Sequence, residues 1–273
     1  MQEFDRNGLK KLYIPPNDSH KGQNGKLFLI SGSKLFHSSS LWTLKIASRI
    51  VDMVFYSSVP ENNRIVLEAK KEFRDGIVIP RNKIQNYIRE ADCVLIGSGL
   101  PREDGIEEGD DDTRELTEKL LKKYPEKKWV IDGGSLQVIA PEIIPHKAII
   151  TPHSREFKTL FDLEVSEENV EKMSQKYGIV ILTKGLMDFV CSPQKCVSIQ
   201  GGNAGMTKGG TGDVLAGLIA ALYCKNDDPF LVASAGSYIN KKAGESLFEK
   251  VGYYFNSSDL VDEIPRVMRK LFI

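Results

Sequence analysis

The sequence predicts an α/β protein in which a mostly parallel central sheet has helices on both faces and an antiparallel hairpin at one edge. Three observations support this fold class: strand-length apolar runs alternate with helix-length segments, several of these runs lack polar alternation, and one pair of runs is joined by only four residues. Strands that are buried on both faces read as continuous apolar runs, as in parallel sheets covered by helices. We therefore expect a single domain over residues 1–273.

The first strand of the sheet is expected at residues 27–30, after a polar, turn-rich arm over residues 1–25. Further strands are expected at the apolar runs 53–56, 93–96, 129–131, 148–150 and 179–182. The helix-length segments between them include residues 41–50, 113–123, 156–161 and 167–177. In such a fold the active-site loops leave the carboxyl ends of the strands, so chemical motifs should directly follow strands.

The pattern changes near residue 186. Residues 187–191 and 196–199 flank Ser192-Pro193-Gln194-Lys195, which predicts the antiparallel hairpin. The last third of the chain is expected to be helical, at residues 214–223, 230–248 and 258–271. The first of these helices is apolar on almost every side and should be buried.

Charge and cysteine content argue against several classes of protein. Thirty-seven Lys and Arg balance thirty-seven Asp and Glu, so no overall charge favours nucleic acid or an anionic membrane as a partner. The N-terminus does not resemble a secretory signal, and no apolar stretch approaches membrane-spanning length, so a cytoplasmic location is expected. The cysteines contain no C-x-x-C pair, so neither a metal site nor a disulfide is expected among Cys93, Cys191, Cys196 and Cys224.

Residues 201–213 form a glycine-rich stretch with six glycines in thirteen residues, directly before an apolar helix. Glycines permit positive φ and close approach of the backbone, while the first turn of a helix supplies unpaired N–H groups and the positive end of a dipole. The stretch therefore predicts a phosphate site. The alternative is a flexible loop that ends in an ordinary Asp N-cap.

Asp213 at the end of this stretch is the candidate catalytic residue. A carboxylate that only capped the helix would place negative charge where a phosphate should bind. Its position is explained if Asp213 is a general base that takes a proton from a substrate hydroxyl, which then attacks a phosphoryl group held by residues 210–212. The chain contains no G-x-x-x-x-G-K-[ST], and Gly97-Ser98-Gly99 lacks the third glycine of a dinucleotide turn.

Several motifs are spread along nearly the whole chain. They are S-H-K-G at residues 19–22, T-P-H-S-R-E-F at 151–157, a strand ending in K-G at 180–185, G-N-A-G-M at 202–206, and G-G-T-G-D-V-L-A-G at 209–217. Together they resemble the motifs of the NAD(P)H-hydrate dehydratases, a family of the ribokinase-like superfamily, and the last string is highly specific. The resemblance implies a ribokinase-like fold for the whole chain.

The resemblance also implies a metabolite-repair reaction. ADP or ATP phosphorylates the 6-hydroxyl of the S form of hydrated NADH or NADPH (NADHX or NADPHX), phosphate then leaves, and the nicotinamide ring is restored. Mg²⁺ would accompany the nucleotide. The partners implied are small molecules, with an epimerase expected on a separate chain. The sequence leaves open whether ADP or ATP is the donor and whether the chain forms a homo-oligomer.

Site residues can be carried over where the motifs match. The resemblance implies that nucleotide or phosphate is bound by Lys184, Gly185, Asn203, Gly209, Gly210, Thr211 and Gly212. It implies that substrate is bound by Ser39, Gly99, Pro101, His153, Ser154, Arg155, Glu156 and Asp213. Glu156 is also a candidate to hold Mg²⁺ through water. For His153 and Glu156 the alternative role is helix capping.

The sequence departs from the family pattern on the presumed substrate side. Residues 36–40 read F-H-S-S-S where the family has Y-T-G-A-P, G-P-G-L-G becomes G-S-G-L-P at residues 97–101, and Gly134 replaces the second acidic residue of D-A-D. Phosphoryl transfer is therefore better supported than the identity of the acceptor. Two alternatives stay open: a small-molecule kinase of the thiazole or hydroxymethylpyrimidine type, and a nucleotide-binding protein that has lost catalysis.

Overall fold

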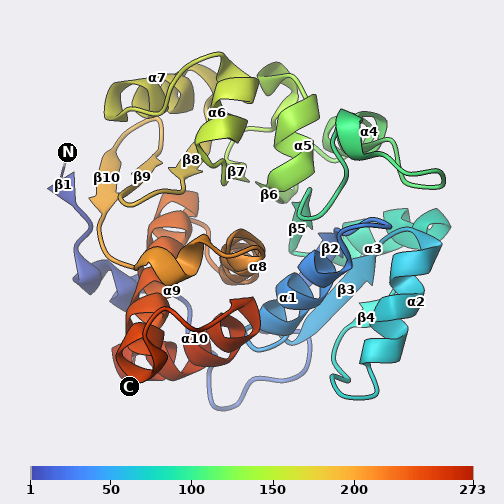
Figure 1. The fold of residues 1–273 in the computed structure, drawn as a ribbon, viewed down its shortest axis with the longest axis horizontal. Coiled ribbons are helices and arrows are strands. Elements are labelled where there is room, and N and C mark those ends of the chain that lie inside the picture. Colours follow the sequence, from blue (N-terminus) through green and yellow to red (C-terminus); the bar gives the residue numbers. More distant parts are fainter. Residues whose placement is uncertain (1, 273) are drawn as a thin grey trace.

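The computed structural model describes residues 2–272, and in this part of the chain ten strands form one sheet in the order β1-β10-β9-β8-β7-β6-β5-β2-β3-β4 (Figure 1). The pairs β8–β9 and β9–β10 are antiparallel, and the other neighbours are parallel. The strand bounds are β1 Gln2–Glu3, β2 Lys26–Ile30, β3 Met53–Ser57, β4 Ile77–Val78, β5 Cys93–Ile96, β6 Lys128–Ile131, β7 Ile149–Ile150, β8 Val180–Thr183, β9 Asp188–Cys191 and β10 Cys196–Ile199.

Helices cover both faces of the sheet, as Figure 1 shows. One face carries α1 His37–Ala47, α2 Pro60–Ala69, α8 Thr211–Tyr223, α9 Pro229–Val251 and α10 Ser257–Phe272. The other face carries α3 Ile84–Glu90, α4 Thr113–Lys123, α5 Gly133–Val138, α6 Ser154–Phe161 and α7 Glu167–Tyr177. The predicted fold class is confirmed. Within residues 2–272, none of the helices combines the length and the apolar character needed to cross a membrane.

Alternation of side chains across the strands explains why the apolar runs are continuous. On β2, Leu27 and Leu29 join the core under α1, α8 and α9, whereas Phe28 and Ile30 join the core on the other face. All four side chains have no exposed surface. Because successive residues of a strand point to opposite faces, a strand covered on both sides needs an apolar residue at every position.

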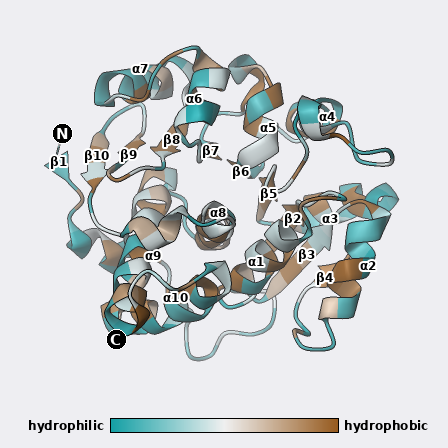
Figure 2. Cartoon of the chain, in the orientation of Figure 1, coloured by the Kyte–Doolittle hydropathy of each residue, from teal (hydrophilic) through white to brown (hydrophobic). Residues whose placement is uncertain are grey.

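Helix α8 is the buried helix that the sequence predicts. Figure 2 shows it end on, between the sheet and helices α1, α9 and α10. Every residue from 214 to 223 is buried. Two glycines let its neighbours approach closely: a Cβ at Gly217 would lie 2.8 Å from Cγ2 of Ile46 in α1, and one at Gly236 in α9 would lie 2.6 Å from Cγ1 of Ile219. Close packing against α1 and α9 fixes the position of α8.

The N-terminal arm contributes a strand that the sequence pattern did not predict. Its short strand β1 pairs in parallel with β10 and takes the outermost position in the sheet, beside the predicted hairpin. Apolar residues anchor the arm: the ring of Phe4 lies 5.7 Å from that of Tyr238, and Leu9 is buried. The partner strand lies almost two hundred residues away in the sequence, so a local sequence pattern cannot predict this pairing.

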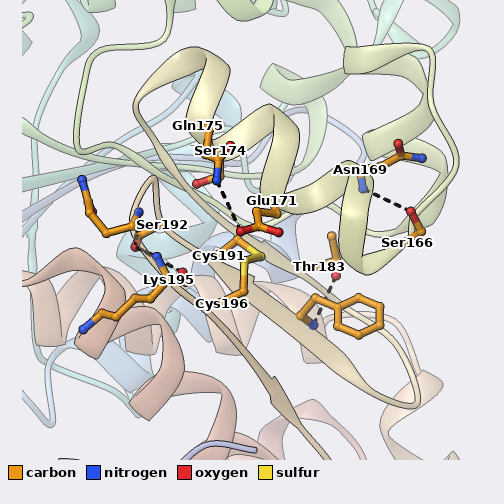
Figure 3. Close-up of a disulfide and its surroundings, with 12 residues drawn as sticks. Ser166, Asn169, Glu171, Ser174, Gln175, Thr183, Cys191, Ser192, Lys195 and Cys196 are labelled. Carbon is orange, nitrogen blue, oxygen red and sulfur yellow. Dashed lines mark hydrogen bonds between the residues drawn. A yellow bond between two sulfur atoms is a disulfide. The ribbon is translucent and has the colours of Figure 1, made fainter. Parts of the chain in front are cut away.

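A disulfide joins Cys191 and Cys196, contrary to the expectation of free cysteines (Figure 3). The two residues lie directly opposite each other in the antiparallel register of β9 and β10, with their Cα atoms 4.1 Å apart. The hairpin turn brings them together, so their spacing in sequence reflects a cross-strand pair. Cys93 and Cys224 are free and buried.

Candidate active site

The carboxyl ends of four neighbouring parallel strands bring the predicted motifs to one edge of the sheet. Gly97–Gly99 follows β5, Asp132 follows β6, His153 lies three residues beyond β7, and Lys184 follows β8. A parallel bridge pairs His153 with Lys184, whose backbone N–H donates to the Pro152 carbonyl at 3.1 Å. The glycine-rich stretch enters α8 beside them. Strand ends in an open α/β sheet commonly line a ligand crevice.

Asp213 occupies the first turn of α8 but does not cap the helix. The N-cap is Gly210, and no side chain caps this end. Instead, the Oγ of Ser39 donates a hydrogen bond of 2.6 Å to Oδ1 of Asp213. Burial, assisted by the negative charge of Asp132, raises the pKa of Asp213 to about 6, although the Ser39 hydrogen bond and the charge of Lys184 act in the opposite direction. A carboxylate with such a pKa can accept a proton near neutral pH.

Two cavities lie on either side of the start of α8. The first, of about 500 Å³, is here called the Ser39 cavity, and the sequence-predicted residues that line it are Ser39, Gly99, His153, Glu156, Gly209, Gly210 and Asp213. The second, of about 480 Å³, is called the Asn203 cavity, and the predicted residues that line it are His153, Lys184, Gly185, Asn203, Thr211 and Gly212. The segment 209–213 therefore separates the cavities, with Asp213 on one side and Gly212 on the other.

Three predicted substrate residues do not line the Ser39 cavity itself. Ser154 and Arg155 line an adjoining open hollow that shares Arg102, Gln137 and His153 with that cavity. Pro101 does not line either cavity, and its carbonyl accepts a 2.6 Å hydrogen bond from Oγ1 of Thr113. The neighbours of Pro101, Leu100 and Arg102, do line the Ser39 cavity.

The departures from the family pattern at residues 97–101 and at Gly134 are linked in space. The N–H of Gly134 donates to the Gly97 carbonyl at 3.1 Å. A Cβ on Gly134 would lie only 2.2 Å from the carbonyl oxygen of Leu100. This conformation of residues 97–101 leaves no room for an acidic side chain at position 134. The loop conformation therefore requires glycine there.

Lys184 is held by an acidic residue that the sequence reasoning missed. Its Nζ lies 2.8 Å from Oδ1 of Asp132, which also accepts from Oγ1 of Thr151 at 2.7 Å, while Ser98 donates to Oδ2 at 3.2 Å. Burial alone would lower the pKa of Lys184, but the charges of Asp132 and Glu156 outweigh it and raise the pKa. Lys184 therefore stays charged. The available signal for Asp132 was its position directly after a buried strand.

His153 and Glu156 combine helix capping with a place in the cavity wall. Nδ1 of His153 accepts from the N–H groups of Arg155 and Glu156, and Oε2 of Glu156 accepts from the His153 N–H at 2.9 Å, which forms a capping box. Nε2 of His153 then carries the ring proton and faces Oε1 of Glu156 at 3.3 Å. Burial, with the charge of Lys184, lowers the pKa of His153, and burial raises the pKa of Glu156 to about 7.

Gly210 marks the point where the segment between the cavities turns into α8. Its φ is +92°, a conformation that side chains disfavour, and a Cβ would lie 2.1 Å from the indole ring of Trp42. Trp42 itself lines the Ser39 cavity and escaped the sequence reasoning. The amides of Gly212 and Asp213 belong to the first helical turn, which has no intrahelical partners for its N–H groups. A base, helix amides and a charged lysine at one junction suit phosphoryl transfer.

Comparison with solved structures defines the class of protein first. A ribokinase-like superfamily protein from Enterococcus faecalis superposes with a TM-score of 0.85 at 21% identity, over 99% of this chain and 96% of that chain. The ADP/ATP-dependent NAD(P)H-hydrate dehydratase of Bacillus subtilis, crystallised with ATP and Mg²⁺, superposes with a TM-score of 0.81 at 19% identity, over 99% and 98% of the two chains. At these identities the likeness concerns the fold, which is ribokinase-like.

Sequence comparison then gives the family. The family model described as NAD(P)H-hydrate dehydratase matches residues 27–266. The ADP-dependent (S)-NAD(P)H-hydrate dehydratase of Nitrosopumilus maritimus is 32% identical over 96% of this chain and 95% of its own length. The bifunctional NAD(P)H-hydrate repair enzyme of Methanocaldococcus jannaschii is 34% identical over 96% of this chain, which spans 51% of that relative. The chain belongs to the NAD(P)H-hydrate dehydratase family, as its motifs predicted, and covers about half the length of its bifunctional relatives.

Proposed function

We propose that this chain is a carbon–oxygen lyase that uses ADP to dehydrate the S form of hydrated NADH and NADPH. The observation that carries the proposal is the position of Asp213 in the wall of the Ser39 cavity, next to Gly212, which lines the Asn203 cavity. In the proposal the hydrated dinucleotide occupies the Ser39 cavity and the nucleotide occupies the Asn203 cavity. Family membership and the near full-length match to a dehydratase named for ADP support this reading.

The first step transfers a phosphoryl group across the junction between the cavities. The oxygen of the substrate 6-hydroxyl attacks the terminal phosphorus of the nucleotide, and Asp213 takes the hydroxyl proton. The amides of the first turn of α8 and the ammonium group of Lys184 face the charge that develops on the phosphoryl oxygens. The bond to the AMP leaving group breaks, and a 6-phosphorylated ring remains.

The second step is an elimination. Hydroxide is a poor leaving group, whereas phosphate is a good one. The lone pair of the ring nitrogen expels phosphate from C6, and loss of a proton from C5 restores the dihydronicotinamide. The net products are NADH or NADPH, AMP and phosphate.

Magnesium fits this site as a companion of the nucleotide. Mg²⁺ commonly binds through one or two carboxylates together with substrate phosphates and water. Within residues 2–272, no group of three or more His, Cys, Asp or Glu forms a metal cage. Both carboxylate oxygens of Glu156 already face His153, so we propose that Glu156 would contact Mg²⁺ through a water molecule. Bound Mg²⁺ would neutralise phosphate charge.

The test is recovery of reduced dinucleotide. The protein is incubated with NADHX, Mg²⁺ and either ADP or ATP, and the absorbance of NADH is followed, with Asp213→Asn as the inactive control. We expect recovery with ADP, release of one AMP for each NADH, and loss of recovery in the variant. Absence of turnover with both nucleotides would refute the proposed activity. We also propose that the reaction takes place in the cytoplasm.

A small-molecule kinase is the second candidate, and the altered substrate side favours it. The changes at residues 36–40 lie in α1 and its N-cap, and members of this segment line the Ser39 cavity. A hydroxyethylthiazole kinase from Pyrococcus horikoshii shares the fold, with a TM-score of 0.60. A kinase would leave a stable phosphorylated product. Phosphorylation of a thiazole or pyrimidine alcohol without recovery of NADH would select this candidate.

A further inference from the structure

A buried lysine on α9 joins two segments of the wall of the Asn203 cavity. Lys241 is buried and lines this cavity together with the residues that it contacts. Its Nζ donates to the carbonyls of Gly185 and Leu186, at 3.1 and 3.3 Å, and to the carbonyl of Gly201 at 3.3 Å. Gly185 and Leu186 follow β8, whereas Gly201 follows β10. One ammonium group therefore holds two loops that are separated in sequence.

The charge of this lysine is balanced within the wall. Oδ1 of Asp188, the first residue of β9, lies 3.2 Å from Nζ of Lys241, and each side chain is only 6% exposed. The same Oδ1 accepts from the Gly185 N–H at 2.9 Å, and Oδ2 accepts from Oγ of Ser237 on α9 at 2.7 Å. Buried charges are tolerated when they are paired and hydrogen-bonded. The backbone of Gly185 is thus held at both its N–H and its carbonyl.

Helix α9 also holds the glycine-rich stretch beyond Gly201. The N–H of Gly202 donates to Oε1 of Glu245 at 3.1 Å. Nδ2 of Asn203 donates to the carbonyl of Gly244 at 2.8 Å. These contacts hold the glycine-rich stretch, whereas Lys241 bridges that stretch to the loop after β8.

The two joined loops flank the part of the cavity formed by Lys184 and Gly212, which we call the phosphate end. A Cβ on Gly212 would lie 3.3 Å from Nζ of Lys184. Lys184 directly precedes Gly185, and the glycine-rich stretch that starts at Gly201 continues to Gly212 in the first turn of α8. A displacement of either loop would therefore move a group of the phosphate end. A backbone that is ordered before the ligand arrives lowers the entropic cost of binding.

We propose that Lys241 is a positioning residue for the donor nucleotide. Its ammonium group is a fixed cation inside the protein that holds the loop after β8 and the glycine-rich stretch in the conformation that binds ADP. It acts through these loops and not by contact with the phosphates. The assignment rests on the proposed function, because it requires the nucleotide to occupy the Asn203 cavity.

Calorimetric titration with ADP alone tests the assignment on the wild type, Lys241→Met and Lys128→Met. Lys128 is a matched control, because its Nζ donates to the carbonyls of Tyr223 and Asn226, at 3.2 and 2.9 Å. It also pairs with Asp227 at 2.7 Å, but it does not line either cavity. We expect Lys241→Met to bind ADP about tenfold more weakly, because binding must then order the loops. Lys128→Met should bind ADP like the wild type.

Steady-state kinetics show on which substrate the change acts. Lys241 does not line the Ser39 cavity, where the hydrated dinucleotide is proposed to bind. In Lys241→Met the KM for ADP should rise by about tenfold, while the KM for NADHX should change by less than about twofold.

A double variant separates positioning from the loss of a buried charge. Lys241→Met leaves the charge of Asp188 without its partner, which destabilises the fold. Lys241→Met with Asp188→Asn removes both charges, so urea unfolding should show recovered stability while the affinity for ADP stays low. The double variant also replaces the single variant if circular dichroism shows that the latter does not fold.

The outcomes separate the two proposals. No binding of ADP to the wild type would overturn the proposed function together with this assignment. Wild-type affinity for ADP in Lys241→Met would overturn the assignment alone, as would an equal loss of affinity in Lys128→Met or an equal rise of both KM values. Recovery of the affinity for ADP in the double variant would show that Lys241 only neutralises Asp188, and it would overturn the assignment as well.

Discussion

Ser39, near the start of α1, donates a 2.6 Å hydrogen bond to Oδ1 of Asp213, in the first turn of α8. The two residues are 174 positions apart, and the close packing of α1 against α8 brings them together. Ser39 is buried and fixes the carboxylate at the wall of the Ser39 cavity. The bond stabilises the charged form of Asp213 against the burial that raises its pKa to about 6.

The first prediction concerns Ser39→Ala. Because the Ser39 hydrogen bond lowers the pKa of Asp213, its removal should raise that pKa above about 6. A general base acts only when deprotonated, so the acidic limb of kcat/KM should move to higher pH by up to about one unit. The pH profile of NADHX dehydration measures the change. Ser38→Ala is the control, since Ser38 lines the same cavity but is exposed. Superimposable limbs for wild type and Ser39→Ala would contradict the role given to this bond.

The second prediction is that Asp213→Asn loses activity and gains stability. Loss of the general base should lower kcat by about 10²–10⁴-fold. The folded-state pKa of about 6 exceeds the ordinary value of 3.8, so the folded protein binds protons more tightly than the unfolded chain. Its stability therefore falls as pH rises from about 4 to 6, by up to about 3 kcal/mol.

The amide side chain of the Asp213→Asn variant cannot ionise, so the variant should not lose this stability between about pH 4 and pH 6. Urea unfolding at pH 8 should show Asp213→Asn to be more stable than the wild type, and the difference should vanish near pH 4. An equal or lower free energy of unfolding for the variant at pH 8 would be incompatible with a partly buried carboxylate whose pKa is raised.

The third prediction separates two roles of Lys184. Lys184→Met should raise KM for ADP by at least about tenfold, because it removes the charge at the phosphate end of the Asn203 cavity. It should also destabilise the fold, since Asp132 would keep a buried charge without its partner. The double variant Lys184→Met with Asp132→Asn should recover most of the stability but none of the affinity for ADP. Recovery of both would show that Lys184 acts only through the ion pair.

Much of the fold and the centre of the site could be predicted because both depend on local patterns. Buried parallel strands are apolar at every position, and α8 is apolar all round, so the sheet and this helix were visible in the sequence. Helices α2, α3 and α5 were not among the segments singled out, although α3 buries Ile84 and Ile88. Helices α3 and α5 have only seven and six residues, so tertiary packing rather than a long periodic pattern defines them.

Contacts between distant segments account for what could not be predicted. Strand β1 pairs with β10, almost two hundred residues further along the chain. The role of Asp132 becomes visible only when the strand order brings it beside Lys184. The disulfide is a different case, because the hairpin was predicted and the four residues of its turn place Cys191 opposite Cys196. Applying the cross-strand register to the cysteines, rather than metal-site spacing, would have identified it.

The fourth prediction concerns this disulfide. The disulfide closes a short loop and so lowers the conformational entropy of the unfolded chain, which is expected to stabilise the fold by about 2 kcal/mol. Reduction, or the double variant Cys191→Ser with Cys196→Ser, should lower the free energy of unfolding by about 2 kcal/mol. It should leave kcat for NADHX unchanged. Titration of thiols in denaturant should give two free thiols before reduction and four after it, since Cys93 and Cys224 are free. Four thiols without reductant would contradict the bond.

The fifth prediction contrasts two adjacent glycines of the segment between the cavities. Gly210→Ala forces a side chain into positive φ and places its Cβ 2.1 Å from the ring of Trp42, so it should destabilise the fold by about 2–4 kcal/mol. Gly209→Ala meets no atom within 4 Å and has an ordinary φ, so it should cost less than about 1 kcal/mol. Urea unfolding of both variants measures the contrast. Equal losses of unfolding free energy in the two variants would show that the contact of Trp42 with the start of α8 does not constrain this turn. Gly210 would then not determine the conformation of the segment between the cavities.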